Sequence, residues 1–112
     1  MPETIFTKII KKQIPAKIEY EDSDYIVIHD IDPKAPVHLL VIPRKEIASL
    51  NDLTSADQAL VGGMFLVARN LMDQMGHKDY RCVFNCGEGA GQSVWHLHLH
   101  VMAGRKFTWP PG

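Results

Sequence analysis

The stretch Ser93-Val94-Trp95-His96-Leu97-His98-Leu99-His100-Val101-Met102 decides how this chain is interpreted. Apolar and imidazole side chains alternate along it, and alternation is the period of a β-strand with one buried face. The pattern predicts a strand over residues 93–103 whose core-facing side chains are Trp95, Leu97, Leu99 and Val101. His96, His98 and His100 then share the opposite face at steps of about 6.5–7 Å. Three aligned imidazoles indicate a functional site, because a structural histidine usually stands alone.

Two chemical interpretations of these histidines are open on the residues alone. Neutral imidazole is a common zinc ligand, and two histidines two apart on a strand can bind one ion, with further ligands from Asp30, Asp32 or His38. Neutral imidazole is also a good nucleophile near pH 7, because its pKa is about 6.5. A flanking histidine can then donate to phosphate oxygens, and Ser93 to a leaving atom. The glycine-rich loop 87–91 lets backbone N–H groups approach a phosphate. We expect nucleophilic catalysis without a metal.

The composition is that of a globular protein. The 112 residues are 46% hydrophobic and 22% charged, which predicts one domain over residues 1–112. A formal net charge of −1 argues against nucleic acid as the main partner, although a small phosphate ligand needs only a local site. We expect no membrane span and no signal peptide. We also expect free thiols at Cys82 and Cys86, and hence a cytoplasmic protein.

The remaining sequence predicts an α+β fold. A first helix is capped by Thr4 and ended by Pro15, and a main helix over 55–75 begins at Thr54 with Asp57 and stops at Gly76. Besides 93–103, strands are expected over residues 17–20, 25–30, 38–43 and 80–86. Five strands and two helices favour a mostly antiparallel sheet.

The main helix carries a wider apolar surface than one sheet face can cover, because such contact needs a stripe of only about 100°. Either the first helix covers the excess or a second subunit does, and we favour the second subunit. Gly62 and Gly63 each lower helix stability by roughly 1 kcal/mol. Two glycines in the helix interior therefore predict close backbone packing.

With these residues in view, the chain resembles the histidine triad (HIT) family. Residues 96–102 match the His-x-His-x-His-x-x pattern with apolar x, and residues 35–43 resemble the family's other characteristic segment. The likeness runs from Ile5 almost to the end of the chain. Residues 91–94 and 107–112 look like the nucleotide-binding Hint branch. The diadenosine-polyphosphate hydrolase branch usually has Thr and Pro at positions 93 and 95, and the galactose-1-phosphate uridylyltransferase branch has Gln at position 100.

The resemblance implies a HIT-like fold and a homodimer whose sheets join into one of ten strands. It implies a purine nucleoside phosphoramidase that cleaves P–N bonds of AMP or GMP amides, and acyl adenylates. His98 would be the nucleophile and form a nucleotidyl-histidine intermediate. His100 would contact the phosphate, His38 and His96 would belong to the supporting hydrogen-bond chain, and Ser93 would face the leaving group.

The resemblance also implies a purine nucleotide site. Asp30 would hold the ribose hydroxyls, since a carboxylate accepts two hydrogen bonds. Further ribose, phosphate and base contacts would come from Asn85, Gly91, Gln92 and Ile31. An apolar base slot would include Phe6, Ile9, Ile14 and Ile28, each of which a place in the core explains equally well. Trp109 would shape the leaving-group end across the dimer.

Two positions depart from the family pattern. Trp95 stands where Tyr is usual, and residues 86–88 differ from the commoner loop sequence. Beside the phosphoramidase, two other functions stay open: a nucleotide-binding sensor or scaffold whose hydrolysis is incidental, and a zinc-binding protein.

Overall fold

The computed structural model describes residues 3–112. Its sheet has five strands in the order β1-β2-β3-β5-β4, and every neighbouring pair is antiparallel. The strands are β1 (Ile18–Glu21), β2 (Tyr25–His29), β3 (Val37–Pro43), β4 (Tyr80–Val83) and β5 (Leu99–Ala103), and the α-helices are α1 (Ile5–Ile10) and α2 (Gln58–Gln74). This confirms the expected α+β architecture of five strands and two helices.

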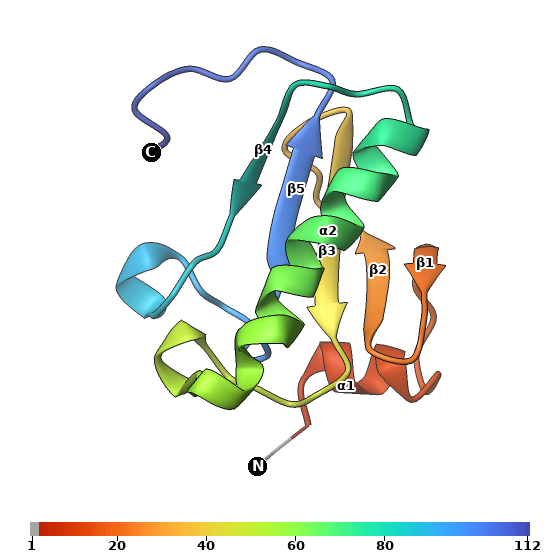
Figure 1. Ribbon diagram of the computed structural model, residues 1–112, viewed down its shortest axis with the longest axis vertical. Coiled ribbons are helices and arrows are strands. Elements are labelled where there is room, and N and C mark those ends of the chain that lie inside the picture. Colours follow the sequence, from red (N-terminus) through yellow and green to blue (C-terminus); the bar gives the residue numbers. More distant parts are fainter. Residues whose placement is uncertain (1–2) are drawn as a thin grey trace.

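The two helices pack on opposite faces of the sheet, with α2 lying across the face nearest the viewer in Figure 1. Alternate residues of β3 point to the two sides, as the period of a strand requires. Leu39 and Val41 join α2 in the larger core, whereas Leu40 and Ile42 join α1 in the smaller one. The sheet therefore has two buried faces, and α1 covers part of the face that α2 does not.

Both helix starts follow the sequence signals. The Thr4 hydroxyl accepts a hydrogen bond from the Thr7 backbone N–H at 3.2 Å. Asp57 accepts from the Thr54 backbone N–H at 3.0 Å and opens the turn that leads into α2. Gly76, at φ +81°, follows the end of α2 as expected. The first helix instead ends at Ile10, before the predicted stop at Pro15, because the chain already turns at Lys12 with φ +60°.

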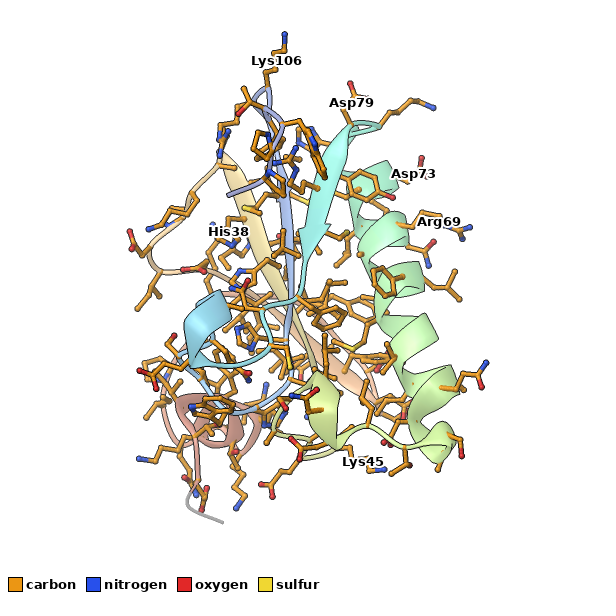
Figure 2. The ribbon with its side chains drawn as sticks, turned by 90° about the vertical axis from the view of Figure 1, so that its left-hand side faces the viewer. His38, Lys45, Arg69, Asp73, Asp79 and Lys106 are labelled. Atoms are coloured by element: carbon orange, nitrogen blue, oxygen red, sulfur yellow. The ribbon has the colours of Figure 1, made fainter. Side chains whose placement is uncertain are left out.

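The first helix does not cover the apolar excess of α2, because it belongs to the core on the other side of the sheet. Phe65 and Leu66 of α2 are 45% and 55% exposed. Arg69 and Asp73 point away from the sheet, as the sequence predicted for the polar strip (Figure 2). Of the two coverings considered, a second subunit stays a prediction. No helix within residues 3–112 is long and apolar enough to cross a membrane.

The predicted close packing of the helix glycines is present at Gly63 only. A Cβ atom at Gly63 would collide with the Tyr25 hydroxyl, which donates a hydrogen bond to the Leu60 carbonyl at 2.6 Å. A Cβ atom at Gly62 would meet open space. Strand β2 and helix α2 therefore approach each other closely at one point, and that point requires a glycine.

Strands β4 and β5 are shorter than predicted, and the placement of Trp95 on the core face was wrong. Strand β5 begins at Leu99, and Trp95 is 46% exposed. The ladder between β3 and β5 stops at Val41 opposite Leu99. The segment before Leu99 bonds elsewhere, because the Leu97 backbone N–H donates to the Ile47 carbonyl at 2.7 Å and the His96 ring bonds the Pro43 carbonyl. Strand β4 ends at Val83, opposite His100. Alternation does hold over residues 96–101.

Candidate active site

His98 and His100 border a pocket on the sheet face opposite α2, the face on which Figure 2 shows His38. The pocket has a volume of about 260 Å³. Its walls come from α1, the ends of β2 and β5, and the segment between β4 and β5. The lining residues are Ile5, Phe6, Ile9, Ile28, His29, Asp30, Ile31, Leu40, Asn85, Gly91, Ser93, Val94, His98 and His100. The predicted site residues missing from this wall are His38, His96, Gln92, Ile14 and Trp109.

A hydrogen-bond chain reaches the pocket through His38 and His100. The Lys34 backbone N–H donates to His38 Nδ1 at 3.0 Å, so that nitrogen must carry a lone pair. The proton of neutral His38 is therefore on Nε2, which lies 2.9 Å from His100 Nδ1. His100 accepts there and keeps its own proton on Nε2. The chain of bonds fixes His100 as an N–H donor.

His98 has the opposite arrangement. Its Nδ1 lies 2.8 Å from the His96 carbonyl oxygen, which can only accept, so Nδ1 bears the proton. The lone pair of His98 is then on Nε2. The ring is held edge-on against Phe6, with centroids 4.9 Å apart. Two neighbouring histidines thus present a lone pair and an N–H donor at one pocket wall.

His96 is the anchor of this segment. Its ring is 2% exposed, and its Nε2–H donates to the Pro43 carbonyl at 2.7 Å. The histidine that the pattern groups with the other two thus has its side chain outside the pocket. Its carbonyl oxygen, not its ring, holds His98.

Burial keeps these imidazoles neutral at pH 7. It lowers the pKa of His38, His96 and His98 below the ordinary value for histidine. Burial, together with the neighbouring His98 and His38, lowers the pKa of His100 to about 4. The neutral forms match the hydrogen bonds, in which each ring has one N–H and one lone pair.

Asp30 lies where the loop after β2 meets the two histidines. Its Oδ2 is 3.4 Å from His38 Nε2, and its Oδ1 accepts from the Asp32 backbone N–H at 2.8 Å. The carboxylate also borders a second cavity of about 350 Å³, which it shares with His38 and His100. Asp30 is thus a held acceptor at the edge of the pocket.

Asp30, His38 and His100 are also the group best placed to hold a metal ion, since one ligand atom of each lies within 4.8 Å of the others. An ion there would need the lone pair of His38 Nε2. The Nε2 proton would have to move to Nδ1, toward which the Lys34 N–H already points. The hydrogen bond from the Lys34 N–H therefore favours the hydrogen-bond chain of His38 and His100 over ligation of a metal ion by His38.

The loop between β4 and β5 is folded by Gln92. Its side-chain oxygen accepts from the Gly87 backbone N–H at 2.9 Å, and its amide donates to the Ala48 carbonyl at 2.8 Å. Gly91, at φ +93°, then turns the chain beside Asn85 and lines the pocket. Gln92 itself is buried and shapes the loop from outside the pocket.

The apolar end of the pocket combines core and surface residues. Phe6, Ile9 and Ile28 belong to the smaller core and also line the pocket, so a place in the core does not exclude the base slot, which stays a prediction. Ile31 is 95% exposed at the rim. Ile14 packs against the smaller core without lining the pocket.

Ser93 and Trp109 lie differently with respect to this pocket. Ser93 is on its wall. Trp109 is 81% exposed and belongs to the C-terminal tail, which the Arg81 side chain holds by donating to the Thr108 carbonyl at 2.9 Å. Within this chain, Trp109 does not reach the pocket wall.

The sequence interpretation missed five contributors. Ile5, His29, Leu40 and Val94 line the pocket. Leu40 could have been found because it lies two residues after His38 on the same strand face. The fifth is the Lys34 backbone N–H. A pattern of side chains in the sequence does not show where a backbone N–H will point in the folded chain.

The chain is similar to known proteins over almost its whole length. The profile of the family described as "Scavenger mRNA decapping enzyme C-term binding" matches residues 3–108. An uncharacterized HIT-like protein of Synechocystis is 47% identical over 98% of this chain and 97% of its own. A HIT family hydrolase from Legionella pneumophila has a TM-score of 0.96 at 43% identity, covering 98% of this chain and 100% of that one.

A zinc-bound histidine triad family protein from Mycobacterium smegmatis is more distant. Its TM-score is 0.79 at 31% identity, covering 90% of this chain and 74% of that one. The family profile, the whole-length relative and the structural match all point to the same group. The chain therefore has a HIT-like fold and belongs to the histidine triad (HIT) family.

Proposed function

We propose that the protein is a purine nucleoside phosphoramidase of the Hint branch, which hydrolyses the P–N bond of AMP or GMP amides. One observation carries the proposal. His98 directs a lone pair, and His100 an N–H, from one pocket wall. A nucleophile beside a hydrogen-bond donor is the arrangement that attack at phosphorus requires.

In the first step His98 Nε2 attacks phosphorus. An N–P bond forms, the P–N bond of the substrate breaks, and the amine leaves with a proton taken from solvent. The positive charge on the phosphorylated His98 ring is stabilised through its Nδ1–H, which already donates to the His96 carbonyl. In the second step water attacks phosphorus and releases a proton to solvent, the N–P bond to His98 breaks, and the nucleotide leaves with the neutral imidazole restored.

The other pocket residues fit the parts of such a substrate. The apolar end accepts a base, and the Asp30 carboxylate accepts hydrogen bonds from ribose hydroxyls. The loop at Gly91 brings backbone N–H groups toward the phosphate, with Asn85 beside it. In this proposal Ser93, on the pocket wall, donates to the leaving amine, and Trp109 would reach that end only from a second subunit.

Turnover on defined substrates tests this proposal. We expect the wild-type protein to release a fluorescent amine from adenosine 5′-phosphoramidate in the presence of EDTA, and not from the same amine linked to phosphate without a nucleoside. AMP binding without turnover on any amide would favour the sensor or scaffold instead. Turnover that EDTA abolishes and zinc restores would favour the zinc protein.

A further inference from the structure

We propose that Arg105 is a positioning residue that sets the direction of the His38–His100 hydrogen-bond chain. It does so through the loop between β2 and β3, residues 30–36, here called the relay loop. This inference rests on the proposed function, because it assigns a remote residue to the proton chain of that same site.

Arg105 connects the end of β5 to the relay loop. Its Nε–H donates to the Lys34 carbonyl at 2.9 Å, and its Nη1 donates to the Lys106 carbonyl at 3.0 Å. The guanidinium stacks over the Phe107 ring at 4.2 Å from the centroid. A planar guanidinium with several donors can make these contacts at once, and an ammonium cannot. The side chain is therefore fixed on three sides.

The residue that Arg105 holds is the one that fixes the tautomer of His38. The Lys34 carbonyl accepts from Arg105, and the N–H of the same residue donates to His38 Nδ1 at 3.0 Å. Because this donor is a backbone group, its direction depends on the conformation of the relay loop and on no side-chain rotamer. Movement of the Lys34 backbone would change the donor distance directly.

The other backbone hydrogen bonds of the relay loop lie at its start, where the Asp30 N–H donates to the His38 carbonyl and Asp30 accepts from the Asp32 N–H. The Lys34–Asp32 ion pair is exposed, with side chains 62% and 84% accessible, and exposed pairs contribute little. Gly104 packs closely on Pro36, since a Cβ atom there would lie 2.8 Å from Pro36 Cβ. That contact limits where the loop can move but gives Lys34 no hydrogen bond. Arg105 supplies the hydrogen bond that the Lys34 carbonyl accepts.

Loss of this contact has a defined consequence for the reaction. Without a steady donor at Nδ1, His38 can carry its proton on Nδ1 and present a lone pair at Nε2. His100 must then donate from Nδ1 and loses the N–H on its pocket side. The phosphate would lose a donor while the base slot and ribose acceptor stay unchanged, so kcat should fall and KM should not.

The test compares Arg105→Met with two controls. Methionine keeps an apolar stem over Phe107 but removes every donor. Lys106→Ala removes a neighbouring charge that points into solvent (Figure 2). Arg81→Ala removes the other arginine beside Phe107, at 5.2 Å, and a bond to the tail. Ring ¹⁵N shifts of His38 report its tautomer without any substrate.

We expect Arg105→Met to lower kcat about tenfold at constant KM, as loss of one net hydrogen bond would. We also expect its His38 Nδ1 signal to move toward the protonated position, while both controls keep the wild-type tautomer. Wild-type ¹⁵N shifts in Arg105→Met, or an equal change in Arg81→Ala, would overturn the inference. Absence of turnover in the wild-type protein would instead contradict the proposed function, and the ¹⁵N shifts would still decide the role of Arg105.

Discussion

Two identical side chains have opposite roles in this site because their backbone partners differ. A carbonyl oxygen holds His98, and a chain that begins at a backbone N–H holds His100 through His38. A carbonyl can only accept and an amide N–H can only donate, so the two rings are fixed in opposite tautomers. The local path of the chain therefore decides which ring presents a lone pair and which an N–H.

The low pKa of His100 predicts how stability depends on pH. The folded-state pKa is about 4 against about 6.5 when unfolded, so the unfolded chain binds the proton more tightly. The contribution of His100 to the free energy of unfolding is fully present above pH 6.5. It is lost as pH falls toward 4, by up to about 3 kcal/mol. We expect chemical denaturation to show this slope of the free energy of unfolding against pH. The slope should be smaller in His100→Asn.

A slope in His100→Asn equal to that of the wild-type protein would contradict this assignment. Asn is the chosen replacement because it cannot titrate. His77→Asn is the matched control, since His77 lies after α2 and outside the pocket wall. That variant should keep the full slope.

The sequence predicted which histidines gather but not which nitrogen of each carries the proton. His96, His98 and His100 share a strand pattern, and the family resemblance added His38. Their tautomers depend on the carbonyls of Pro43 and His96 and on the Lys34 N–H. Each of these is a backbone group that only the folded chain brings near.

At the scale of elements, the ladder between β3 and β5 is shorter than the alternating pattern of the sequence. Pairing of β3 with β5 stops at Val41 opposite Leu99, so alternation in the sequence extends beyond the ladder. Periodicity predicts which face a side chain takes, and it does so correctly for Leu97, Leu99 and Val101. It does not say where hydrogen bonding ends, and Trp95 was misplaced for that reason.

The contact between β2 and α2 gives a prediction for the two glycines of α2. Gly63→Ala forces its methyl group into the Tyr25 hydroxyl and should lower the free energy of unfolding by about 2 kcal/mol. Gly62→Ala has open space and should raise it by about 1 kcal/mol through helix propensity. Urea denaturation of the two variants measures both.

A second substitution checks the cause of the loss at Gly63. Tyr25→Phe removes the hydroxyl that the new methyl group would meet, together with its bond to Leu60. In that background Gly63→Ala should be far less harmful. Equal losses with and without the hydroxyl would mean that another contact is responsible.

At the scale of the molecule, one apolar surface has no cover within residues 3–112. It comprises Phe65 and Leu66 of α2 and Tyr80 of β4, which are 45%, 55% and 36% exposed. Phe65 packs edge-on against Phe84, just after β4, with ring centroids 5.9 Å apart. Since β4 is an edge strand with unpaired backbone groups, we propose that this side joins two subunits and extends the sheet to ten strands.

Leu66→Glu tests this assembly. A carboxylate placed in an apolar interface would lose its hydration without gaining a partner, so sedimentation should show a dimer for the wild-type protein and a monomer for the variant. Gln58→Glu adds a charge to an exposed position at the start of the same helix and should stay dimeric. A wild-type monomer at micromolar concentration would contradict the proposed assembly, as would a dimer in Leu66→Glu.

The measurement that tests the central claim most directly is turnover of an adenosine 5′-phosphoramidate by His98→Asn, beside its binding of AMP. Asparagine cannot form the nucleotidyl intermediate, so kcat should fall at least about a thousandfold while AMP affinity and fold persist. His77→Asn, altered outside the pocket, should keep wild-type turnover. Wild-type turnover in His98→Asn would contradict the account, because the lone pair on His98 would then not be the nucleophile.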